Sequence, residues 1–132
     1  MMAISLLRPW RVSEKKGNFK VSAQVNVIGS DVLVILWGGT NPHIGAIGVA
    51  QPRPSLKDSE IVSATSSVFT FLGHKEDVVA KEMSEELARN LNRKVVVVAG
   101  MHWENLHDEG IDEVIRICKR LKAKIQEGMK EA

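Results

Sequence analysis

A single cysteine, Cys118, is present among 132 residues. Because one cysteine cannot form an internal disulfide, the sequence favours a reducing compartment, and we expect a cytoplasmic protein. No apolar run approaches the roughly 20 residues that a membrane-spanning helix needs. Residues 1–10 show no charged segment followed by a long apolar stretch, so no signal peptide is expected. Together these absences predict a soluble protein without a membrane partner.

Neither sign of charge is in large excess, since 18 basic residues are balanced by 16 acidic ones and the formal net charge is +2. This balance argues against a nucleic-acid partner. Tyrosine is absent, and three tryptophans and three phenylalanines are the only aromatic residues. The hydrophobic fraction is nevertheless 44%, which supports a core without disulfides. The length fits one domain over residues 1–132.

The first two expected strands form a hairpin. Apolar and polar residues alternate from Phe19 to Val27, which is typical of a half-buried strand. Gly29 to Asp31 supply a turn, and Val32 to Trp37 form a continuous apolar run, as in a central strand covered on both faces.

Three further strands follow at intervals. Ile44 to Ala50 is a strand interrupted by glycine, and we expect Pro52 and Pro54 to end it. Ser63 to Phe71 has the β-branched and aromatic residues of a strand. Lys94 to Val98 is short and apolar after its first residue, which indicates burial on both faces, and Gly100 to His107 should be a loop.

Two segments have the apolar spacing of helices. One begins near Glu76 and Asp77 and carries an apolar stripe to Leu91, and the other runs from Ile111 to Ile125. The element order is therefore β-β-β-β-α-β-α, to which residues 8–17 add a short edge element. The predicted fold class is α/β (α+β mixed), with a mixed sheet of about five to six strands and two helices packed on it.

Three of these strands should end at one edge of the sheet. If the first four strands form a meander, the second and fourth point the same way, and the helix after the fourth is long enough to make the fifth parallel to them. Ligands of α/β sheets commonly bind beyond such carboxyl ends. The segments concerned are Gly38–His43, Gly73–Lys75 and Gly100–Glu104, which hold His43, His74 and His102, with His107 just beyond.

The segment from Trp37 to Gly45, WGGTNPHIG, is the most distinctive of the three. Its backbone N–H groups could hold a phosphate or carboxylate, with His43 beside them. Alternatively, it is a tight connection that needs a positive φ at Gly39. It matches neither the Walker pattern nor the dinucleotide glycine fingerprint. Both interpretations stay open on the residues alone.

The other two segments also allow two interpretations each. Gly73, His74 and Lys75 open a helix whose free N–H groups could bind an anion, but the acidic pair that follows would repel a phosphate, so ordinary helix initiation is favoured. Trp103 could stack on a planar ligand that His102 or Glu104 hydrogen-bonds, or it could close the sheet edge or a subunit interface.

Metal binding and covalent catalysis are less well supported. No closely spaced histidine pair lies within one element, so no metal site is predicted. Cys118 falls on the apolar face of the last helix, where it should be core rather than nucleophile. Ser66 and Ser67 lack a nucleophile-elbow context. We therefore expect no catalytic residue.

Three segments carry a family resemblance: WGGTNPHIGAIGVAQPRPSL (residues 37–56), SSVFTFLGHKEDVVAKE (66–82) and VVVVAGMHWENL (95–106). Their specific pieces are Pro-His-Ile-Gly, Gly-His-Lys and His-Trp-Glu-Asn. In these pieces, and in the order of elements from about Phe19 onward, the chain resembles the LpdD-like family. This is the prenylated-flavin chaperone family typified by the D subunit of gallate decarboxylase.

The resemblance implies a fold like that of proteasome-assembly chaperones, which tend to dimerise, so we expect a homodimer or higher homo-oligomer. It also implies a non-catalytic accessory protein that binds prenylated FMN or FMN as cargo. The cargo would be delivered to a UbiD-type aromatic-acid decarboxylase, or used to mature it, with the flavin prenyltransferase as a further partner. The alternatives are a homodimeric assembly module without a small ligand and a small histidine- or metal-dependent enzyme. From the loop argument, the expected cofactor-binding residues are Trp37, Gly38, Gly39, Asn41, His43, Gly45, Gly73, His74, Lys75, His102, Trp103 and Glu104.

Overall fold

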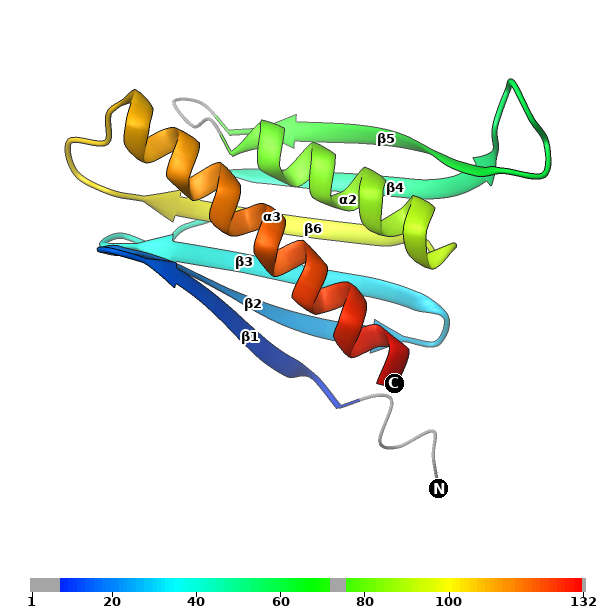
Figure 1. The fold of residues 1–132 in the computed structure, drawn as a ribbon, viewed down its shortest axis with the longest axis horizontal. Helices are drawn as coiled ribbons and strands as arrows, with labels where there is room; N and C mark the ends of the chain where they lie inside the picture. The colour runs from blue at the N-terminus through cyan, green and yellow to red at the C-terminus, as the bar shows by residue number, and fades with distance from the viewer. Residues whose placement is uncertain (1–7, 72–75, 132) are drawn as a thin grey trace.

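The computed structural model describes residues 8–71 and 76–131. Figure 1 shows one twisted sheet with both helices on the same side of it. The mixed sheet and two helices confirm the predicted fold class. The strands are β1 (Trp10–Lys16), β2 (Phe19–Ile28), β3 (Asp31–Gly39), β4 (Ala46–Pro54), β5 (Val62–Thr70) and β6 (Val95–His102), and the helices are α2 (Asp77–Leu91) and α3 (Asp108–Glu131).

The strand order across the sheet is β1-β2-β3-β6-β4-β5. The predicted β2–β3 hairpin and the edge strand β1 are confirmed. The predicted meander of four strands is wrong, because β6 lies between β3 and β4, parallel to β3 and antiparallel to β4. The physical reason is that β6, like β3, has apolar residues on both of its faces, and β6 has no charged residue, which suits a central strand paired along both of its edges.

Two predicted strand boundaries are also wrong. Residues 100–102 belong to β6 rather than to a loop, because β3 and β6 pair residue by residue as far as Gly39 and His102. Pro52 does not end β4, which runs on to Pro54. β6 pairs with β4 only as far as Ala50, so a proline beyond that point removes no hydrogen bond to β6.

The core lies between the sheet and the two helices. α2 packs on β4, β5 and β6, whereas α3 packs on β1 and β2 and contacts α2. Burial of each large side chain contributes about 1.5–3 kcal/mol relative to exposure to water, so this layer holds the helices on the sheet. The largest fully buried apolar side chains are Val21, Val25, Val34, Leu36, Leu87, Val95, Val97, Ile117, Leu121 and Ile125.

The opposite face of the sheet carries no helix among the residues that the structure describes (Figure 1). Because side chains alternate along a strand, every second residue of the central strands points to this side. Many of these residues are large and apolar, and they are only half-buried or exposed, as with Phe69 at 62%. This open face consists of Leu33, Ile35 and Trp37 of β3, Ile47 and Val49 of β4, Phe69 of β5, and Val96 and Val98 of β6.

Neither α2 nor α3, the helices within the described ranges, has both the length and the apolar composition to cross a membrane.

Candidate functional site at the sheet edge

Three strands end at one edge of the sheet, as predicted. β3 is parallel to β6, and β5 points the same way because β4 is antiparallel to both β5 and β6. The prediction holds although the meander is wrong, because inserting β6 between β3 and β4 leaves the direction of every strand unchanged. The edge gathers the segments after β3 and β6 and the start of α2.

The segment after β3 crosses closely over β6 to reach β4. The N–H of Thr40 donates to the carbonyl oxygen of His102 at 2.8 Å. The expected positive φ at Gly39 is confirmed at 85°. A Cβ at Gly100 would lie 1.5 Å from the carbonyl oxygen of His43, so only glycine leaves room for the crossing. This crossing fixes the backbone at His43.

His43 is held by both nitrogens of its ring. Nδ1 lies 3.1 Å from the carbonyl oxygen of Asn41, and Nε2 lies 3.1 Å from Oε1 of Glu76. A carbonyl oxygen only accepts, so the proton of the first contact belongs to Nδ1. The His43–Glu76 pair is a polar contact that ties the crossing segment to the start of α2.

Glu76 is a site residue that the sequence did not indicate. We expected it to start α2 as an acidic first-turn residue, but it occupies the N-cap position without making a side-chain cap hydrogen bond. Its buried side chain instead turns toward the sheet, where the N–H of Met101 donates to Oε1 at 3.3 Å. A Cβ at Gly45 would lie 2.4 Å from Oε2, so this glycine makes room for the carboxylate. The only signal in the sequence that Glu76 belongs to the site was its position directly after the Gly-His-Lys piece.

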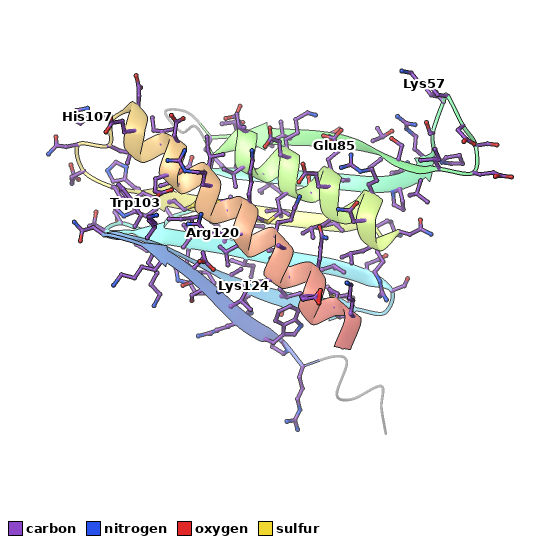
Figure 2. The ribbon with its side chains drawn as sticks, viewed as in Figure 1. Lys57, Glu85, Trp103, His107, Arg120 and Lys124 are labelled. Carbon is purple, nitrogen blue, oxygen red and sulfur yellow. The ribbon has the colours of Figure 1, made fainter. Side chains whose placement is uncertain are left out.

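The other histidines of the edge are less enclosed. The rings of His43 and His102 have centroids 6.4 Å apart, and His102 Nε2 lies 3.5 Å from Oε1 of Glu104. Both His102 and Glu104 are largely exposed, so their contact is weak. His107 is exposed in the segment before α3, and Figure 2 shows it at the same end of the molecule as Trp103.

Trp103 forms one wall of a groove between the sheet edge and the N-terminal parts of the two helices. Its ring packs edge-on against Phe19, with centroids 5.4 Å apart. The groove has a volume of about 460 Å³, and Glu76 and His102 are its polar residues. The predicted helical stripes included Val79, Ile111, Val114 and Ile115, but the sequence did not indicate that these residues line a groove. The apolar lining consists of Val78, Val79, Met101, Leu106, Ile111, Val114 and Ile115.

The structure does not bring all the predicted residues into this groove. Gly38 lies against Trp103, since a Cβ there would be 3.4 Å from the indole. Trp37 points to the open face, on the opposite side of the sheet, where the guanidinium of Arg11 lies 5.8 Å from its ring centroid. A single planar ligand therefore cannot stack on Trp37 and Trp103 at once. Gly73, His74 and Lys75 lie outside the described residues.

Cys118 is buried in the core, as expected. Burial raises the pKa of its thiol from 9.0 to about 12. Within residues 8–71 and 76–131, no three His, Cys, Asp or Glu side chains are grouped as a metal ion would require.

Comparison with solved structures identifies the fold first. The chain is similar to a solved chaperone complex for yeast 20S proteasome assembly, with a TM-score of 0.51 and 12% sequence identity over 89% of this chain and 95% of that one. At that identity the likeness shows the fold alone.

Sequence comparison then gives the family. Residues 15–130 match the prenylated flavin chaperone LpdD-like domain. Protein LpdD of Lactiplantibacillus plantarum is 31% identical over 90 residues, which cover 67% of this chain and 61% of that protein. The chain belongs to the LpdD-like family, which confirms the predicted resemblance and supports an accessory chaperone role.

Proposed function

We propose that the protein binds prenylated FMN as cargo and helps deliver it to, or mature, a UbiD-type aromatic-acid decarboxylase. The observation that carries this proposal is the groove beside Trp103 in a chain of the prenylated flavin chaperone family. Its volume of about 460 Å³ falls within the range of small-molecule sites. Apolar walls with a few polar groups suit a planar ring that carries a prenyl substituent.

The charges along the groove suggest how a flavin would be oriented. The carboxylate of Glu76 disfavours a phosphate nearby but can accept a hydrogen bond from the imide N–H of a flavin ring. We therefore assign the ring system to the groove, against Trp103 and toward Glu76. The phosphate then lies outward, near His102.

His43 and Asn41 have an indirect role in this proposal. Asn41 orients the ring of His43, and His43 orients the carboxylate of Glu76. These two residues act as positioning residues, and Gly39 and Gly45 leave room for the backbone of His102 and the carboxylate of Glu76. An accessory protein that releases its cargo needs no nucleophile, so a site of this kind can be complete without one.

The open face supports the homodimer. Its eight large apolar side chains form one contiguous apolar surface, as the core of a subunit interface requires. Uncharged polar residues of β2 line one side, in the arrangement of an apolar interface core with a polar rim. We propose that two copies pack face to face here, and that the decarboxylase and the flavin prenyltransferase contact other surfaces.

Titration with prenylated FMN and with FMN tests the cargo site. We expect a dissociation constant of about micromolar strength, or roughly −8 kcal/mol. Trp103→Ala should weaken binding about tenfold, because it removes one wall of the groove and a stacking partner. Trp37→Ala is the matched control and should leave the affinity unchanged. A loss with Trp37→Ala alone would place the ligand on the open face instead.

An assembly module without a small ligand is the second candidate, favoured by the fold shared with the proteasome-assembly chaperone complex. In that case neither flavin would bind to folded protein. The open face would still be needed for self-association.

A further inference from the structure

The groove beside Trp103 is polar at one end only. Its polar side chains, Glu76 at the start of α2 and His102 at the end of β6, lie at the sheet edge, and the carboxylate of Glu76 turns toward the sheet. Where the groove enters the space between the two helices, the lining residues within the described ranges have only apolar side chains. This apolar end consists of Val78 and Val79 of α2 and Ile111, Val114 and Ile115 of α3.

Beyond its apolar end the groove narrows sharply. Val78, Val79 and Ile115 also line a crevice between α2 and α3, and its volume is about 20 Å³, against about 460 Å³ for the groove. That space holds about one water molecule. Met83 and Cys118, which belong to the buried core, line the crevice as well. The groove therefore does not extend along the helices as a channel.

Two contacts past the groove hold α2 and α3 together. The ammonium of Lys122 pairs with the carboxylate of Glu86, and the side-chain amide of Asn90 donates to the side-chain oxygen of Gln126 at 3.0 Å. Both pairs join residues that are 36 positions apart, so the two helices run parallel in this region. The helices cannot separate here without breaking both contacts, and the apolar end of the groove is thus a closed end.

From this taper we infer that the apolar end takes the prenyl group of the flavin, and that Val79, Val114 and Ile115 make the protein select prenylated FMN over FMN. The narrow crevice limits the length of the group that fits. The inference rests on the cargo role proposed above and adds which chemical feature of the cargo the site recognises.

The selectivity follows from the polarity of the lining. FMN lacks the prenyl group and would leave the apolar end filled with water, whereas a prenyl group is wholly hydrocarbon. Each buried methylene group raises affinity about fourfold. FMN should therefore bind at least tenfold more weakly than prenylated FMN. A longer chain would have to displace buried core side chains such as Met83, which opposes its binding.

Filling the apolar end tests the inference. Ile115 is only half-buried, so Ile115→Phe should fold and place its larger side chain in the groove. We expect the affinity for prenylated FMN to fall at least tenfold and the affinity for FMN to change less than twofold. Val78→Phe, at a residue that is 48% exposed, should act in the same way if Ile115→Phe does not fold. Ile61→Phe is the matched control, because it enlarges an exposed side chain between β4 and β5, and it should change neither affinity.

The outcomes separate this inference from the cargo role. A wild-type protein that binds both flavins equally, or folded Ile115→Phe and Val78→Phe proteins that keep their preference for prenylated FMN, would overturn the selectivity and leave the cargo role standing. A wild-type protein that binds neither flavin would overturn both.

Nuclear magnetic resonance of methyl-labelled protein locates the prenyl group without any substitution. Prenylated FMN should shift the methyl signals of Val79 and Ile115, and FMN should leave them near their positions in the free protein. Both ligands should shift the indole N–H signal of Trp103. Equal methyl shifts with the two ligands would place the prenyl group elsewhere. FMN that carries a geranyl group, twice as long, tests the closed end: tighter binding than that of prenylated FMN would show that the groove continues past the crevice.

Discussion

A methyl group at residue 100 should disrupt the crossing that positions His43. The Cβ of Gly100→Ala would lie 1.5 Å from the carbonyl oxygen of His43 and 2.3 Å from its carbonyl carbon. Both neighbours are backbone atoms, which cannot rotate away. The crossing segment would have to withdraw by about 2 Å to reach an ordinary contact distance of 3.4 Å.

The Gly100→Ala substitution should lower the free energy of unfolding in two ways. Overpacking in a tight region costs about 1–3 kcal/mol. Withdrawal of His43 also takes a partner from the buried carboxylate of Glu76, which adds about 1–3 kcal/mol. A loss of about 2–6 kcal/mol in the free energy of unfolding corresponds to a melting temperature roughly 10–20 °C lower for a chain of this size.

Thermal unfolding followed by circular dichroism measures this loss. Gly17→Ala is the control, because nothing lies within 4 Å of its Cβ and only the positive φ of 60° is strained. That strain costs about 1 kcal/mol. If Gly100→Ala melted no lower than Gly17→Ala, the segment after β3 would not cross β6 as described, and the positioning of Glu76 by His43 would lose its basis.

Two further predictions concern ionisation. Cys118 should not react with a thiol reagent near pH 8 in the folded protein, because burial raises the pKa of its thiol to about 12. It should react fully after unfolding in denaturant. Rapid reaction of the native protein would show that α3 is not packed as described. The pKa of Glu14 is lowered by its hydrogen bond to Lys124 and by the charge of Arg120. As the pH falls, the unfolded chain therefore takes up the proton before the folded chain does. The ion pair stabilises the fold above about pH 4.5, and this stabilisation is lost as the pH falls through the lower pKa of the folded state. Lys124→Met should therefore flatten the acid side of the melting-temperature profile, and an unaltered profile would show that the pair contributes nothing.

Strand directions could be predicted from the sequence because they depend on short-range patterns. The alternation from Phe19 to Val27 and the glycine turn after it specify a hairpin locally. The position of β6 could not be predicted in the same way. Whether β6 lies outside β5 or between β3 and β4 depends on how all six strands pair, and that is a property of the whole sheet.

The side-chain environment of the site was harder to predict than its location. A continuous apolar run from Val32 to Trp37 does not reveal which face each residue takes, so nothing in that run separates Trp37 from Trp103. Glu76 resembles an ordinary acidic helix start, and only the distance between α2 and β6 shows that its carboxylate turns inward to Met101. Both features depend on contacts between segments far apart in the chain.

The separation of these surfaces has a consequence for an accessory chaperone. The groove lies on the helix side at the carboxyl ends of β3 and β6, whereas the open face lies on the opposite side of the sheet. Self-association through the open face would leave the groove open to solvent. Copies in an oligomer could then each bind and release cargo without dissociating. Under the proposed cargo role, this arrangement predicts that flavin affinity is the same in wild-type protein and in Trp37→Ala, a substitution on the open face.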